Sequence, residues 1–127
     1  MSSTPLTPHF NLEEFKCPCC GQVDAAAALQ LAKRLEPVRL DTGPMIIDSG
    51  FRCPKHNAAV GGKTNSAHLI GLAADIQCTN DPHRFTLIKS LLEHGFLRLG
   101  VDENDIHADI APRPGPCIWT YYTPDNR

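Results

Sequence analysis

The clearest hydrophobic pattern in the chain is helical and begins just after Asp24. Apolar side chains recur there at intervals of three and four residues, at Ala28, Leu31, Ala32 and Leu35. This spacing is typical of a helix with one buried face. Asp24 can cap the first turn, and we expect the helix to end at Pro37, because proline has no backbone N–H and clashes with the preceding turn.

A second helical pattern lies in the C-terminal half of the chain. Asp81 and Pro82 are start signals, and Gly95 is a stop signal. The apolar side of this helix is predicted to consist of Phe85, Leu87, Ile88, Leu91 and Leu92. A shorter helical turn is expected after Pro54, and residues 63–67, which follow two glycines, are expected to form an irregular loop.

The remaining apolar runs are short and β-prone. One spans residues 45–47, and residues 71–78 form a small, apolar run that contains a single charged residue, Asp75. Three further strands are predicted at residues 96–101, 106–111 and 117–122, separated by the segments DEND and PRPGP. An isolated buried carboxylate is costly, so Asp75 is a residue for which a partner must be found.

Length and charge limit the number of domains and the kinds of partner that this chain can have. The chain has 127 residues, so we predict one domain over residues 1–127, with frayed ends at 1–9 and 123–127. A formal net charge of −2 and a pI near 6.3 give no broad basic field, so we expect no nucleic-acid partner. No basic or apolar leader precedes His9, so we expect the chain to be made in the cytoplasm and not to insert into a membrane. We also expect it to be a monomer.

Six cysteines are more than an ordinary cytoplasmic domain carries, and three of them lie in the segment CPCCG. Cys17 and Cys20 have the two-residue gap of a zinc knuckle, but no second Cys or His pair follows in the sequence. Cys53 or Cys117 could complete such a site only through the fold. A second metal, a disulfide bridge and reduced, partly buried thiols all remain open.

The most informative polar residues are two histidines and a carboxylate. His68 and Asp75 stand seven residues apart in the segment SAHLIGLAAD, and His107 lies in the segment IHADI. Two histidines and one carboxylate are a ligand set of zinc hydrolases, and three protein ligands leave a position at which water can be activated. We therefore predict a Zn²⁺ cofactor held by these three residues.

Three segments in this order carry a family resemblance: SGFRCPKHNAAVGG, SAHLIGLAAD and IHADI. Together they resemble the zinc peptidases of the M15 family, which include D-Ala-D-Ala carboxypeptidases and endolysin-type peptidases. The resemblance extends from about Phe10 to Ala111. It implies an α+β fold of the Hedgehog/DD-peptidase type, with helices packed on a central antiparallel sheet. It also implies hydrolysis of peptidoglycan stem peptides, at a D-Ala-D-Ala bond or at a bond of the L-Ala-D-Glu type.

The resemblance also implies roles for single residues. His68, Asp75 and His107 match the zinc ligands of the family. Arg52 matches an arginine that faces the active site, where its fork of N–H donors suits a substrate carboxylate or the oxyanion of the transition state. Ser66 matches a serine that contacts the substrate or orients a ligand, although a hydroxyl that caps the loop is an equal alternative.

The general base is the one role for which this chain departs from the family pattern. Many members of the family have a carboxylate three residues before the last histidine, and this chain has Asn104 there, which cannot take a proton from water. Asp105 and Asp109 lie two residues on either side of His107, so in a strand both share its face. We predict that Asp105 is the base, with Asp109 as the alternative base or as a residue that orients a ligand.

Two rival functions follow from the same residues. Asn104 favours a zinc-binding module without catalysis, as in Hedgehog signalling domains of the same fold. The chain could also be an accessory part of a phage particle that binds peptidoglycan. For an active enzyme without a signal peptide, we expect release by other means and action on the cell wall, as for a phage or prophage lysin.

Overall fold

The computed structural model describes residues 3–121 of the chain. Its helices are α1 (Ala25–Thr42), α2 (Pro54–Ala59) and α3 (Asp81–Glu93), with the short 3-10 turns η1 (Leu12–Phe15) and η2 (Ala67–Ile70). Its strands are β1 (Pro5–Thr7), β2 (Phe10–Asn11), β3 (Ile47–Ser49), β4 (Ala73–Gln77), β5 (Arg98–Val101), β6 (Asp105–Asp109) and β7 (Cys117–Thr120). The helices and strands predicted from the hydrophobic pattern are therefore present, most with shorter bounds, but the strand predicted at residues 45–47 lies two residues later, at Ile47–Ser49.

A five-stranded sheet in the order β3-β4-β6-β5-β7 forms the centre of the molecule. The pairs from β3 to β5 are antiparallel, but β7 runs parallel to β5. The prediction of an antiparallel sheet is therefore wrong at this edge. The chain leaves β6, crosses the end of the sheet through residues 110–116 and returns beside β5 in the same direction as β5.

Alternation along the two central strands separates the faces of the sheet. Ala74 and Ile76 of β4 and Ile106 and Ala108 of β6 belong to the hydrophobic core. The residues between them face the other way, because successive side chains of a strand point to opposite sides. One face of the sheet is therefore apolar, and the other carries Asp75, His107 and their neighbours.

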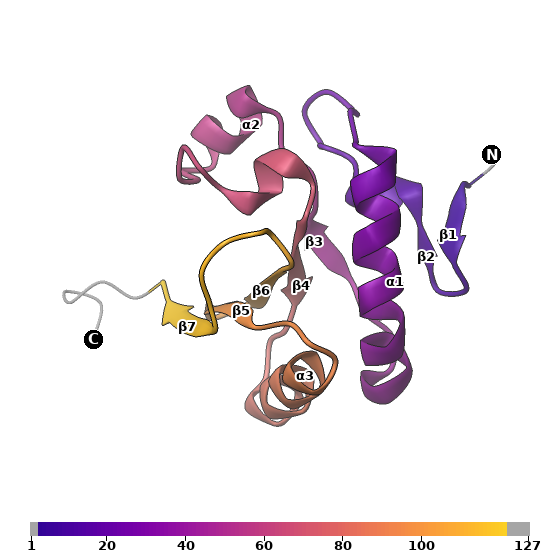
Figure 1. Ribbon diagram of the computed structural model, residues 1–127, viewed down its shortest axis with the longest axis vertical. Coiled ribbons are helices and arrows are strands. Elements are labelled where there is room, and N and C mark those ends of the chain that lie inside the picture. Colours follow the sequence, from indigo (N-terminus) through magenta and orange to yellow (C-terminus); the bar gives the residue numbers. More distant parts are fainter. Residues whose placement is uncertain (1–2, 122–127) are drawn as a thin grey trace.

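Helices α1 and α3 cover the apolar face. Their buried side chains Leu31, Leu35, Val38, Leu87 and Leu91 form one cluster with the sheet. In Figure 1, α1 lies between the sheet and the hairpin β1–β2, and α3 lies below the sheet. The predicted apolar side of α3 is wrong at two positions, since Phe85 is 70% exposed and Leu92 is 41% exposed.

Helix α1 does not end at Pro37, as the sequence suggested. It continues to Thr42 with the proline inside it. The next residue, Val38, is fully buried in the core, and the carbonyl left without a partner belongs to exposed Lys33, where water can reach it. Burial of the last turn thus outweighs the local cost of proline.

The N-terminal segment from Pro5 onward is part of the fold, although residues 1–9 were predicted to be frayed. Strands β1 and β2 form a hairpin beside α1, and Leu6 packs against the core. The His9 backbone N–H donates to Glu36 of α1 at 3.0 Å, which holds the hairpin to the helix. Residues 1–2 and 123–127, for which fraying was also predicted, lie outside the described residues.

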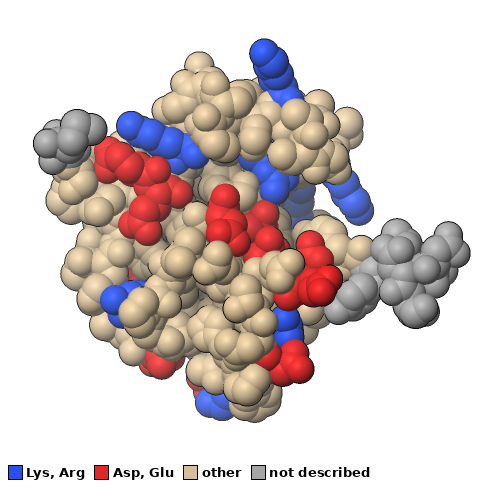
Figure 2. Space-filling view, turned by 180° about the vertical axis from the view of Figure 1, so that it is seen from behind, with Lys and Arg blue, Asp and Glu red and all other residues tan. Residues whose placement is uncertain are grey.

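Charged groups of both signs occur on the face shown in Figure 2, with acidic groups across its middle and basic groups mostly above them. On this face the described residues form no continuous basic surface. Within residues 3–121, no helix is both long enough and apolar enough to span a membrane.

Candidate metal centre

The structure brings His68, Asp75 and His107 together on the polar face of the sheet. Asp75 in β4 is paired directly with His107 in β6. His68 reaches them from η2, the 3-10 turn that precedes β4. One donor atom from each residue lies within 4.8 Å of the other two. The spacing of seven residues between His68 and Asp75 thus reflects a turn that folds back onto the strand after it.

The distances within this group fit a tetrahedral metal ion. Asp75 Oδ1 lies 3.1 Å from His68 Nε2 and 3.2 Å from His107 Nδ1. Nitrogen and oxygen ligands bind zinc at about 2.0–2.1 Å, so ligand atoms on a tetrahedron are about 3.3–3.4 Å apart. A small adjustment would therefore accommodate Zn²⁺ between these three atoms.

His68 is held in the orientation that a ligand needs. Its ring is buried, and its Nδ1 lies 2.7 Å from the carbonyl oxygen of Gly50. A proton on Nδ1 satisfies that carbonyl and leaves Nε2, the nitrogen nearest Asp75, free to bind a metal. Ser66 supports the same turn, because its Oγ accepts a hydrogen bond from the His68 backbone N–H at 3.2 Å.

His107 is held in the same way by Asp109. Its Nε2 lies 2.7 Å from Asp109 Oδ2, on the opposite side of the ring from Asp75. Arg98 donates from Nε to the other oxygen of Asp109 at 2.9 Å. A carboxylate behind a metal-binding histidine fixes the ring and increases its basicity. The structure thus places Asp109 behind His107, with both oxygens engaged.

The electrostatic state of Asp75 reflects its neighbours. Burial opposes ionisation, yet hydrogen bonds from His107 and His68 outweigh it and hold the pKa of the Asp75 carboxyl below its usual range. Asp75 Oδ2 accepts a hydrogen bond from Arg52 at 3.0 Å. The two oxygens of Asp75 are therefore divided between the histidines and the arginine.

Arg52 is more engaged than the sequence indicated. Besides Asp75, its guanidinium donates to Ser49 Oγ at 3.1 Å and to Asn57 Oδ1 at 3.3 Å. Three of its five N–H donors thus bind neighbouring side chains. It lines the cleft in front of the metal centre, but its nearest partner is the carboxylate of Asp75.

Asp105 lies on the same face of β6 as His107 and lines the same cleft. Burial, aided by the negative charge of Asp75, raises the pKa of its carboxyl to about 6. Within residues 3–121 its side chain accepts no hydrogen bond, in contrast to Asp109. Asn104, at the position where a carboxylate was expected, is exposed in the turn before β6.

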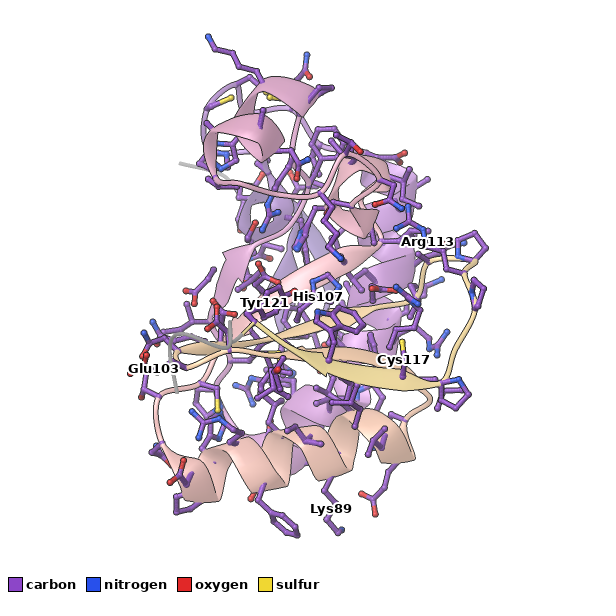
Figure 3. All side chains as sticks on the ribbon, turned by 90° about the vertical axis from the view of Figure 1, so that its left-hand side faces the viewer. Lys89, Glu103, His107, Arg113, Cys117 and Tyr121 are labelled. Atoms are coloured by element: carbon purple, nitrogen blue, oxygen red, sulfur yellow. The ribbon has the colours of Figure 1, made fainter. Side chains whose placement is uncertain are left out.

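The cleft has a volume of about 1130 Å³, and both buried histidines line it. Figure 3 looks onto this face, with His107 and Tyr121 close together at its centre and Arg113 at one side. Trp119 of β7 packs against His107, with ring centroids 5.2 Å apart, and Tyr121 follows at 6.5 Å from Trp119. Gly100 makes this approach possible, because a Cβ there would lie 2.6 Å from Trp119 Nε1.

Sequence reasoning missed Trp119, Tyr121, Lys63 and Arg113 as cleft residues. The tryptophan is the single one in the chain, which is a weak signal by itself. Its place beside His107 depends on the parallel pairing of β7 with β5, and the hydrophobic pattern does not reveal that pairing.

This arrangement defines a metal centre of the hydrolase type, with two histidines, one carboxylate and an open side that faces a cleft. A model of the family described as Peptidase M15 matches residues 8–111. The chain therefore belongs to the M15 peptidase family, which confirms the family predicted from the three segments. The family and the donor set together support Zn²⁺ as the cofactor.

One relative supports the same family assignment. The zinc D-Ala-D-Ala carboxypeptidase of Streptomyces albus G is 31% identical over 104 residues, which cover 75% of this chain and 40% of that protein. The chain thus spans less than half the length of this relative.

Proposed function

We propose that this chain is a zinc peptidase that hydrolyses the stem peptides of peptidoglycan, with the DD-peptidase type of fold. The observation that carries the proposal is the convergence of His68, Asp75 and His107 beside an open cleft, with each histidine fixed through its second ring nitrogen. A purely structural zinc site is usually closed by four protein ligands. Here three side chains converge, and their open side faces the cleft.

In this proposal His68, Asp75 and His107 hold the zinc ion. When bound, zinc supplies a Lewis acid that activates water and polarises a peptide carbonyl. Arg52 and Asp109 act as positioning residues: Arg52 holds Asp75, and Asp109 holds His107. The fold thus fixes the ligands before a substrate arrives, which is what a catalytic site of this kind requires.

Asp105 is the proposed general base. It lies in the cleft, shares a strand face with His107 and has a carboxylate that is not tied to a cation within the described residues. A carboxylate placed in this way can take a proton from water and return it to the leaving amine. Asp109 is a poorer candidate because His107 and Arg98 occupy its oxygens. The presence of Asp105 also weakens the case for a non-catalytic module.

The cleft offers two cations for a substrate carboxylate. Arg52 and Arg98 are bound to Asp75 and Asp109, whereas Lys63 and Arg113 line the cleft with no ion pair among the described residues. Stem peptides carry several carboxylates. We propose that Lys63 and Arg113 bind them, and that Trp119 and Tyr121 form an apolar wall beside the scissile bond.

The test uses purified sacculi and synthetic stem peptides. Zinc-loaded protein is expected to release peptide fragments whose masses identify the bond, either a D-Ala-D-Ala bond or an internal L,D bond. A chelator should abolish the release, and added Zn²⁺ should restore it. A protein that binds zinc and sacculi but releases no fragment would be a binding module of the same family, and the proposal would be wrong.

A further inference from the structure

A second group of metal-binding side chains lies away from the cleft. It consists of Cys17, Cys19 and Cys20, which follow η1, and Cys53, which precedes α2. Their four sulfur atoms all lie within 4.8 Å of one another. We propose that these four cysteines, here called the cysteine cluster, bind a second zinc ion that has a structural role.

The sulfur distances fit this ion. The separation is 3.3 Å between Cys19 and Cys53, 3.7 Å between Cys17 and Cys19, and 3.7 Å between Cys17 and Cys53. Thiolates bind zinc at about 2.3 Å, so the sulfurs of a tetrahedral site are about 3.8 Å apart. A disulfide joins two sulfurs at about 2.05 Å. Two of the three separations therefore match edges of a zinc tetrahedron, the third is about 0.5 Å shorter than such an edge, and none is near the length of a disulfide bond.

The backbone around the cysteine cluster is shaped like a metal-binding turn. Gly21 N–H donates to the Cys17 carbonyl at 2.8 Å, and Gly21 adopts a positive φ of 71°, so the chain folds tightly over the sulfurs. Two N–H groups also point at sulfur atoms. Cys53 N–H lies 3.5 Å from Cys17 Sγ, and His56 N–H lies 3.4 Å from Cys53 Sγ. Such donors stabilise thiolates that bind a metal.

The cysteine cluster contains four of the six cysteines of the chain. The other two cysteines of the described residues lie elsewhere: Cys78 is buried at the end of β4, and Cys117 contacts Arg98. Four thiolates complete the coordination of zinc and leave no position for water. The geometry thus points to a closed, structural ion and not to a second reaction centre.

The place of the cysteine cluster in the fold suggests what such an ion would do. It would join the segment before α1 to Cys53, the residue that directly follows Arg52. The adjacent backbones already touch, since Phe51 N–H donates to the Phe15 carbonyl at 2.9 Å. An ion at this point would fix the start of α2 and, through Arg52, the position of Asp75.

Zinc content tests the proposal on the full chain, purified under reducing conditions. Elemental analysis is expected to find two zinc ions per chain in the natural protein and one in the double variant Cys19→Ser/Cys20→Ser, whose side chains are exposed. The control Cys117→Ser removes an exposed cysteine outside the cluster and should keep two. Two zinc ions in the double variant would overturn the proposal.

A second measurement does not depend on that variant folding, nor on peptidase activity. In the variant His68→Ala/His107→Ala the cysteine cluster is intact, so one zinc ion should remain. Its X-ray absorption should show only sulfur neighbours at about 2.3 Å, without nitrogen or oxygen neighbours at about 2.0–2.1 Å. Loss of all zinc from this variant, once circular dichroism shows that it is folded, would contradict the proposal. So would a mass of the unreduced natural chain lowered by the two hydrogens that a disulfide removes.

Discussion

The two clusters of metal-binding side chains in this chain differ in where their residues come from and in what surrounds them. His68, Asp75 and His107 lie on or beside paired strands and line a cleft of about 1130 Å³. The cysteine cluster lies in a loop and at the start of α2. The first cluster has three protein donors and an open side, whereas the second has four donors.

This difference distinguishes a catalytic zinc site from a structural one. An ion with three protein ligands keeps a position for water or substrate, but an ion with four thiolates only holds chain segments together. The supporting contacts agree with this division. Each histidine of the first cluster is oriented by an oxygen on its second ring nitrogen, as catalytic zinc ligands usually are. The sulfurs of the second receive backbone N–H groups.

The largest effect is expected from His68→Ala. The variant should lose the zinc ion of the cleft, and its activity should fall by more than about 100-fold. This loss is larger than the loss expected from removal of a residue that only orients a ligand. Because His68 is buried, circular dichroism must first show that the variant is folded. Full activity in a folded variant would remove His68 from the ligand set.

Substitution of Asp105 should separate chemistry from metal binding. Asp105→Asn keeps the shape of the side chain but cannot accept a proton, so kcat should fall about 10²- to 10⁴-fold while the zinc content stays unchanged. Asp102→Asn is the matched control, since Asp102 also lines the cleft. An equal loss in both variants would show a general effect of charge and would refute Asp105 as the base.

Removal of Asp109 should weaken the metal centre more mildly. Asp109→Ala takes the oxygen partner from His107 Nε2, so zinc affinity should fall about 10- to 100-fold. Zinc titration with a competing chelator measures this change. If Asp109 were itself the base, the variant would instead keep its zinc affinity and lose its activity.

A substitution at Gly50 should affect the connection between the two clusters. A Cβ at this position would lie 2.7 Å from Phe15 Cα and 2.9 Å from the Phe15 carbonyl oxygen, both backbone atoms. Gly50→Ala should therefore destabilise the fold by about 1–3 kcal/mol. It should also lower zinc affinity, because the Gly50 carbonyl holds His68. Thermal unfolding measures the loss of stability. The control is Asp48→Ala, which changes an exposed neighbour and should have little effect.

The sequence predicted the elements of this fold better than their arrangement. Spacing of three and four residues indicated α1 and α3, and Asp75 in an apolar run indicated β4. The extent of α1 beyond Pro37 could not be predicted locally, because it depends on the burial of Val38 in the core. The parallel pairing of β7 depends on a crossover that leaves no periodic signal.

The same distinction applies to the site. The three candidate ligands could be named because three segments in the right order resemble the family, whereas a histidine and a carboxylate seven residues apart are common by chance. The partners of Arg52 could not, since Ser49, Asn57 and Asp75 meet it only after folding. Cys53 likewise joins Cys17, Cys19 and Cys20 only in space, so the pattern CPCCG showed three of the four cysteines of that cluster.

The most direct test of the account is anomalous diffraction at the zinc absorption edge from crystals of the zinc-loaded chain. We predict one peak about 2.0–2.2 Å from His68 Nε2, His107 Nδ1 and Asp75 Oδ1, with its fourth side open to the cleft, and a second peak among the four sulfurs. Absence of zinc from the first position, or a fourth protein ligand that closed the ion there to water, would contradict the assignment of a catalytic metal centre.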